Sequence, residues 1–124
     1  MLEKYVLFGI ITAMTATKTK RINRKLINEM VGRIVRQFRP QKVILFGSHA
    51  GGTAGPDSDI DLLVVMPVAG SKRSKAVEIG VSLHDMNVAK DVIVVRPDEF
   101  EWRKDIVGTI EWPAAHEGEV LYAE

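Results

Sequence analysis

The chain contains no cysteine, which excludes disulfide bonds and thiolate metal sites. Aromatic residues make up only 6% of its 124 residues, and they do not alternate with basic residues as in RNA-stacking surfaces. The apolar stretch at residues 5–16 is shorter than the roughly 20 residues that a membrane-spanning helix needs. From these absences we expect a cytoplasmic protein that neither enters a membrane nor binds nucleic acid directly.

Length and composition favour one globular domain. Hydrophobic residues make up 46% of the chain and charged residues 27%, as in ordinary soluble domains, and this length supports a single core without crosslinks. We expect the domain to span residues 22–124 and residues 1–21 to form an N-terminal extension. The sequence leaves open whether Met14 is the true start, or whether the extension adds a strand or a contact within a homo-oligomer.

Charge is distributed unevenly along the chain, although the net charge is only +1. Lys and Arg dominate residues 18–42, whereas Asp and Glu dominate residues 98–124. A basic segment of this kind can meet nucleotide phosphates or an acidic partner. Because charged side chains are mostly exposed in folded proteins, a solvated helix face is the simpler interpretation.

A strong helical pattern covers residues 22–38. Apolar residues recur there every four positions, at Ile22, Leu26, Met30, Ile34 and Phe38. This spacing predicts an amphipathic helix that packs on the strand following it. Asn23 is a candidate cap, and Pro40 ends the helix because the residue before a proline avoids helical geometry.

A second helix is predicted to begin at Ser71 or Ser74 and to run to about Met86, where Asn87 suits its end. Its expected apolar side comprises Ala76, Val77, Gly80, Val81 and Leu83.

A last helix is predicted from Asp98 to about Trp112. Pro97 fits the first turn of this helix, and Pro113 is expected to break it. The apolar residues 120–122 that follow predict a short closing strand or a docked tail.

Three aspartates stand at the entrances of predicted strands. Short β-branched runs predict strands over residues 43–46, 60–65 and 91–95. Strand side chains alternate between faces, so Asp59 and Asp61 point the same way, about 6–7 Å apart, while Ile60 points into the core. Asp91 opens the next strand.

If these strands are neighbours, the carboxylates of Asp59, Asp61 and Asp91 can converge. Their repulsion is relieved by a hard dication, and oxygen ligands favour Mg²⁺ or Mn²⁺. Asp91 is then the natural general base for an attacking hydroxyl. Aspartates at strand ends more often serve only to cap loops, so the prediction depends on the whole ordered set of residues.

A Gly-Ser turn follows the first strand. Gly47 lets a phosphate approach the backbone, and its neighbouring amides with the Ser48 hydroxyl can hold terminal phosphate oxygens of a triphosphate. The turn differs from a P-loop, because no Lys-Ser/Thr follows the glycines. His49 is either a phosphate contact or a solvated loop residue.

Gly47-Ser48 followed by Ser58–Val64 resembles the polymerase-β-type nucleotidyltransferase superfamily. The short chain and its ending, Glu117–Tyr122, resemble the minimal members known as MNT proteins. The resemblance covers residues 22–122. It implies an α+β fold, a mixed sheet with helices packed mainly on one face. It also implies Mg²⁺ at Asp59 and Asp61, with a third carboxylate at Asp91.

The chain departs from this family in the loop after the Gly-Ser turn. An arginine common in the family is replaced by Gly51. Lys72, Arg73 or a basic residue of the first helix is the candidate replacement.

The resemblance further implies an enzyme that moves AMP from ATP to a hydroxyl. MNT proteins are typically antitoxins of small helical HEPN toxins, and some modify a tyrosine of that partner. Two alternatives remain open: an antitoxin that neutralises its toxin by binding alone, and transfer to a small molecule of the aminoglycoside type. Relatives of the second kind usually carry an added helical domain.

Overall fold

A computed structural model describes residues 23–55 and 58–124. A mixed four-stranded sheet of order β4-β3-β2-β5 organises these residues, with β2 antiparallel to β3 and β5, and β3 parallel to β4. This α+β architecture confirms the predicted fold class. The elements are α2 (Arg24–Phe38), β2 (Lys42–Phe46), α3 (Ser48–Gly51), β3 (Ile60–Val65), α4 (Lys72–Ser82), the 3-10 turn η1 (His84–Met86), β4 (Lys90–Val95), α5 (Pro97–Arg103), α6 (Glu111–Glu117) and β5 (Glu119–Ala123).

The predicted N-terminal extension, residues 1–21, lies outside the described residues. Within the described residues, no helix has both the length and the apolar character to cross a membrane.

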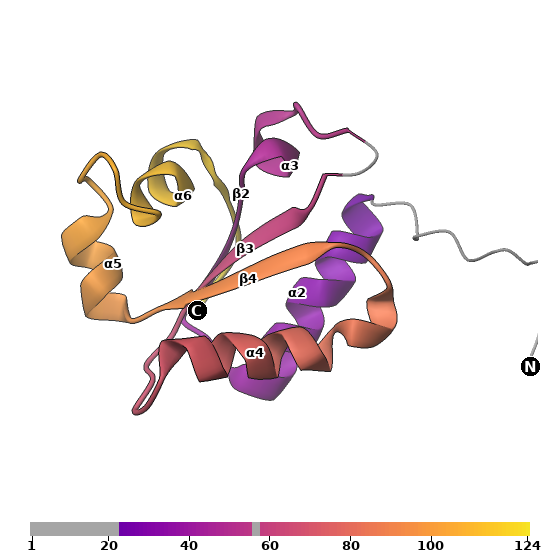
Figure 1. Cartoon of the computed structure of the whole chain (residues 1–124), viewed down its shortest axis with the longest axis horizontal. Helices are drawn as coiled ribbons and strands as arrows, with labels where there is room; N and C mark the ends of the chain where they lie inside the picture. Colours follow the sequence, from indigo (N-terminus) through magenta and orange to yellow (C-terminus); the bar gives the residue numbers. More distant parts are fainter. Residues whose placement is uncertain (1–22, 56–57) are drawn as a thin grey trace, which may run out of the picture.

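Helices cover both faces of the sheet, whereas the resemblance implied helices mainly on one face. The long helices α2 and α4 lie on one face, and the short helices α5 and α6 lie on the other (Figure 1). Strand alternation explains the two layers, because Leu62 and Val64 of β3 join the larger apolar cluster under α2 and α4. Leu63 and Val65 join the smaller cluster with Phe100 of α5.

Helix α2 matches its prediction closely. Asn23 caps it, since its side chain accepts a 2.9 Å hydrogen bond from the backbone N–H of Leu26. Arg39 ends it in the left-handed region with a φ of 51°, directly before Pro40. The predicted stripe is buried at Leu26, Met30 and Ile34, and Phe38 packs at its margin.

The predicted apolar side of α4 is confirmed at Leu83, which is buried, and at Ala76, which packs against the core, but it is wrong at Val77 and Val81. Ser71 caps the helix as expected, but the α-helix ends at Ser82, and η1 continues the chain to Asn87. Val77 is 59% exposed and Val81 is 62% exposed, whereas Ile79 is fully buried. The buried side is narrower than expected and is centred on Ile79, which the prediction omitted and which packs into the core with Leu83.

The predicted helix over residues 98–112 is two helices. Helix α5 ends at Arg103, and the connection passes through Gly108 with a φ of 100°, a conformation that glycine accepts most readily. Pro113 lies in the first turn of α6, where its missing N–H has no helical partner to lose. Glu111 begins α6 and is 2% exposed, and its Oε1 has no hydrogen-bond partner among the described residues.

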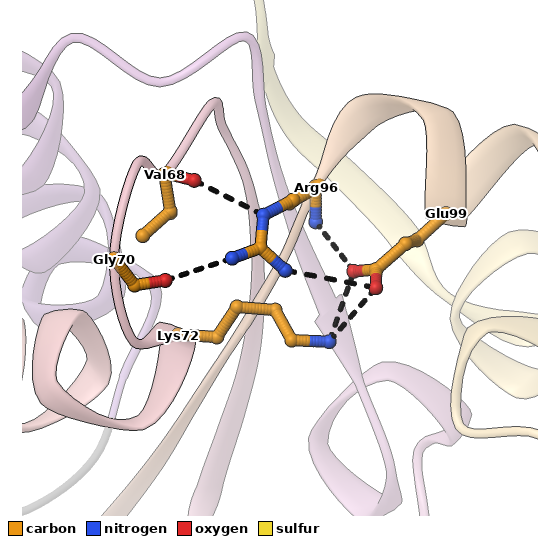
Figure 2. Close-up of polar contacts among 5 residues, drawn as sticks. All are labelled: Val68, Gly70, Lys72, Arg96 and Glu99. Carbon is orange, nitrogen blue, oxygen red and sulfur yellow. Dashed lines mark hydrogen bonds and ion pairs between the residues drawn. The ribbon is translucent and has the colours of Figure 1, made fainter.

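A polar cluster fastens the loop before α4 to the start of α5 (Figure 2). Arg96 donates to the carbonyls of Val68 at 3.0 Å and Gly70 at 2.7 Å. Glu99 accepts from Lys72 Nζ at 2.9 Å and from the backbone N–H of Arg96 at 3.2 Å. The Glu99 side chain is 23% exposed, so solvent weakens these charge-assisted bonds only in part.

The cluster predicts a pH-dependent contribution of Glu99 to stability. The hydrogen bond from Lys72, and then that from the Arg96 backbone, hold the pKa of the Glu99 carboxyl below its ordinary 4.5. A depressed carboxyl pKa stabilises the folded state above the ordinary pKa, and this stabilisation is lost as the pH falls through the lowered value. The melting temperature of Glu99→Gln should therefore lie below wild type at pH 7, and the difference should close between about pH 5 and pH 3.

The matched control is Glu117→Gln, which changes an exposed carboxylate of α6 and should show a small difference at either pH. A Glu99→Gln difference that persists unchanged at pH 3 would contradict the assignment.

Candidate functional site

The carboxylates of two neighbouring strands lie side by side at one end of the sheet. In the register of the strands, Phe46 of β2 pairs with Asp61 of β3, and Asp61 pairs with Asp91 of β4. Because side chains alternate along a strand, those of Phe46, Asp61 and Asp91 all lie on the face that carries α5 and α6. Asp59 directly precedes β3 and is exposed, while Ile60 is fully buried as predicted.

The half-buried Asp61 is the electrostatic centre of this group. Burial raises the pKa of its carboxyl above the ordinary 3.8, and the charges of Asp91 and Asp59 raise this pKa further. A smaller opposing effect on the pKa comes from His49. The three aspartates named from the sequence are therefore electrostatically coupled, with Asp61 receiving the repulsion of both others.

Gly47 lies directly against Asp61. Its φ of 76° falls in the region that favours glycine, and a Cβ at this position would overlap Oδ2 of Asp61. Ser48 follows as the first residue of α3. The fold thus brings the Gly-Ser turn to the acidic end of β3, and it adds a reason for Gly47 that the sequence did not reveal.

His49 braces the loop that leads to Asp59. Its Nε2 is 3.1 Å from the carbonyl oxygen of Ser58, which requires the imidazole to donate from Nε2. The Ser58 hydroxyl in turn accepts a 2.8 Å bond from the backbone N–H of Gly55. The sequence weighed His49 as a phosphate contact or a solvated residue, and the structure gives it a third role as a connection between α3 and the Asp59 loop.

The donor set is suited in chemistry to a hard dication. The three carboxylates offer oxygen ligands, and both burial and the charges of Asp91 and Asp59, which raise the pKa of Asp61, disfavour the ionised carboxylate in the absence of a cation. Among the described residues, however, no three His, Asp or Glu side chains already converge closely enough to hold one ion. Within residues 23–55 and 58–124, the carboxylates are thus coupled but do not form a preformed cage.

The structure separates the candidate replacements for the missing loop arginine. Lys72 forms an ion pair with Glu99. It follows the C-terminal end of β3, whereas Asp61 lies near the N-terminal end of that strand. Arg73 instead lines a groove of about 300 Å³ that Asp91 also lines. A Cβ atom added at Gly51 would have no neighbour within 4 Å, so the fold has room for a side chain there.

Comparison with known proteins identifies relatives. A family model of the nucleotidyltransferase domain matches residues 27–112. A Sulfolobus solfataricus protein assigned as a nucleotidyltransferase has a TM-score of 0.52 and 22% identity, over 81% of this chain and 79% of that one. A mutant of the MntA–HpeT toxin–antitoxin has a TM-score of 0.50 and 17% identity, over 78% and 73% of the two chains. At these identities the likeness shows a shared fold. No curated protein matches the sequence.

The coupling of the aspartates predicts that Asp61→Asn is more stable than wild type. The amide removes a half-buried charge that two neighbouring carboxylates repel. Because the pKa of Asp61 is raised, the folded state loses stability as the pH rises from the ordinary 3.8 through the raised pKa, and the loss is complete above it. The melting temperature in EDTA at pH 7 should therefore rise for Asp61→Asn, and this gain should disappear when the wild-type carboxyl is protonated at low pH. Glu29→Gln, on the exposed side of α2, is the matched control; an equal gain there would refute the explanation.

The close approach of Gly47 predicts a cost for Gly47→Ala. The methyl group would overlap the Asp61 carboxylate in a backbone conformation that alanine disfavours, so we expect a loss of about 1–3 kcal/mol in the free energy of unfolding. Gly51→Ala, with open space and no positive φ, should be neutral or slightly stabilising. Measured by chemical denaturation, the Gly47→Ala cost should shrink when Asp61 is also alanine; equal costs in the two backgrounds would show that Asp61 is not the obstacle.

Proposed function

This chain belongs to the nucleotidyltransferase domain family, and from that premise we propose that it transfers a nucleoside monophosphate to a hydroxyl group, in the cytoplasm. The donor is a nucleoside triphosphate, with ATP the first candidate, and pyrophosphate is the other product. The acceptor is a tyrosine of a helical HEPN toxin, for which the chain acts as antitoxin.

One observation carries this proposal: Asp61 and Asp91 are paired residues of adjacent strands, and Gly47 touches Asp61. Phosphoryl chemistry needs carboxylates and a phosphate-binding backbone in one place. The three segments are distant in sequence, and the sheet register supports their cooperation at one site.

Each residue has a distinct role in the proposed step. The Gly47 backbone and the Ser48 hydroxyl bind the triphosphate. The acceptor oxygen attacks the α-phosphorus and forms a new P–O bond, while the bond to the bridging α–β oxygen breaks and its electrons leave with pyrophosphate. Asp91, exposed at the entrance of β4, accepts the proton of the acceptor hydroxyl.

Asp59, Asp61 and Asp91 are the residues that would hold Mg²⁺, or Mn²⁺ in its place. When bound, the cation supplies positive charge that neutralises phosphate oxygens and the carboxylates together. The partial burial of Asp61 and its position beside Asp91 and Asp59, which together raise the pKa of its carboxyl, support this assignment.

The toxin partner is proposed from two features. The Gly-Ser turn, the Asp-x-Asp strand and the C-terminal Glu117–Tyr122 resemble MNT antitoxins. One protein of similar fold is part of a toxin–antitoxin, MntA–HpeT.

A second candidate function is neutralisation by binding, without catalysis. The observation that favours it is the glycine at position 51, together with the engagement of Lys72 at the far end of β3. Because the fold has room for a side chain at this position, Gly51→Arg should raise ATP affinity and transfer rate if the site is catalytic.

The two functions are separated by incubating the protein with ATP labelled at the α-phosphate, Mg²⁺ and the helical protein encoded beside it. We expect label on the partner, lost by about 100-fold or more in Asp59→Asn, Asp61→Asn and Asp91→Asn. Asp98→Asn, an exposed aspartate of α5, is the matched control and should retain transfer. If no label moves, and the three variants still neutralise the partner in a growth assay, the binding function is correct and the enzyme is refuted.

A further inference from the structure

We propose that the acceptor hydroxyl reaches this site on an extended peptide segment that adds as a strand to the outer edge of β4, beside α4. The inference rests on the proposed function for the reaction itself. It adds the surface that binds the acceptor and the kind of segment that fits.

The outer edge of β4 is open at the end that carries Asp91. β4 is the last strand of the sheet, and no described strand pairs with its outer side. Burial increases along β4: Lys90, Asp91 and Val92 at its start remain accessible, whereas Val94 and Val95 at its end are buried. Backbone groups of this edge can therefore pair with an added strand, as in β-augmentation.

A groove accompanies this edge. The α4–β4 groove has a volume of about 300 Å³ and is lined by Arg73, Ala76, Val77 and Gly80 of α4 together with Lys90–Val92 of β4. The small residues Ala76 and Gly80 stand one turn apart and leave the space, and Val77 is 59% exposed. The side chains of an added strand could enter the groove between helix and edge.

Strand alternation connects the groove to the site. Asp91 faces the α5 and α6 side of the sheet, whereas Val92 belongs to the apolar cluster under α4. Adjacent strands lie about 4.7–4.9 Å apart. A residue of the added strand opposite Asp91 would thus present its hydroxyl beside that carboxylate, while the residues before and after it would enter the α4–β4 groove.

Charge indicates which segment fits. Arg73 and Lys90 form no ion pair with any described residue, and the Lys90 ammonium donates only to the carbonyl of Val88 at 3.1 Å. A peptide with an acidic residue on one side of its hydroxyl residue and an apolar residue on the other would match the basic and apolar parts of the groove lining. A second copy of the chain suits it less, because pairing two β4 edges would bring the Arg73 and Lys90 residues of both copies together.

The test measures binding separately from transfer. Full-length protein is immobilised and exposed, without ATP, to a library of capped heptapeptides with a fixed central tyrosine and random neighbours. We expect enrichment of acidic and apolar residues at positions −1 and +1, with no acidic enrichment at −2 and +2. The enriched peptide should shift the amide resonances of Lys90–Val92, and N-methylation of its backbone should abolish binding.

Gly80→Leu is the decisive variant. The Cβ direction of Gly80 is open, so leucine should fill the α4–β4 groove without disturbing the helix, and peptide affinity should fall by about tenfold or more. Glu78→Leu adds the same side chain to α4 outside the groove lining and should leave affinity unchanged. Arg73→Glu should remove the preference for an acidic neighbour.

The outcomes separate this inference from the proposed function. Alternating peptide enrichment that Gly80→Leu abolishes supports the groove, even if no nucleotide is ever transferred. Transfer to the toxin that Gly80→Leu leaves intact refutes the groove while the enzyme stands. The inference is also overturned if the enriched peptides show no alternation of side-chain preference around the tyrosine. Two other contrary results are that the groove binds ATP and no peptide, or that Gly80→Leu dissociates a dimer of the chain.

Discussion

The parallel, in-register pairing of β3 with β4 is the constraint on which the candidate site depends. It sets Asp61 beside Asp91, so two like charges stand on adjacent strands and the pKa of Asp61 rises. The rest of β3 offsets this cost, because Leu62, Leu63 and Val64 are fully buried and each contributes about 1.5–3 kcal/mol of hydrophobic stabilisation. The buried apolar part of β3 thus keeps Asp61 beside Asp91 despite the repulsion between their carboxylates.

The position of the acidic end follows from the two faces of the sheet. On the face of α5 and α6, the apolar row Ile44–Leu63–Ile93 crosses three strands, and the next row on that face is Phe46–Asp61–Asp91. On β3 and β4, the side chains on this face therefore change from apolar to acidic between one row and the next. The carboxylates therefore stand at the boundary between a dry cluster and solvent, where a charged ligand can reach them and where Asp61 is only partly desolvated.

Prediction from sequence succeeded where the signal is local. The spacing of apolar residues located α2, and β-branched runs located β2, β3 and β4 within one residue, because period and composition report burial directly. It failed where two local signals compete. Val77 and Val81 were expected on the core side of α4 together with Leu83, but they are exposed and Ile79 is buried beside Leu83, since the position of neighbouring strands decides which face is covered.

The C-terminal helices show a related failure. A proline such as Pro113 is compatible both with the end of one helix and with the first turn of another. In the structure the chain turns at Gly108, where φ is positive, and a separate helix begins at Glu111. No sequence pattern states that φ value in advance, because it depends on how α5 and α6 both pack against the sheet.

The sequence by itself determined the chemical inventory: a Gly-Ser turn, three aspartates at strand entrances, no thiol ligand, and apolar strands able to hold them. Only the tertiary structure decided that Asp61 and Asp91 are register partners, that Gly47 lies against Asp61, and that Lys72 serves a distant cluster. The physical reason is that strand pairing and register join residues far apart in the chain. Local periodicity specifies which face a side chain takes, and carries no information about which strand becomes its neighbour.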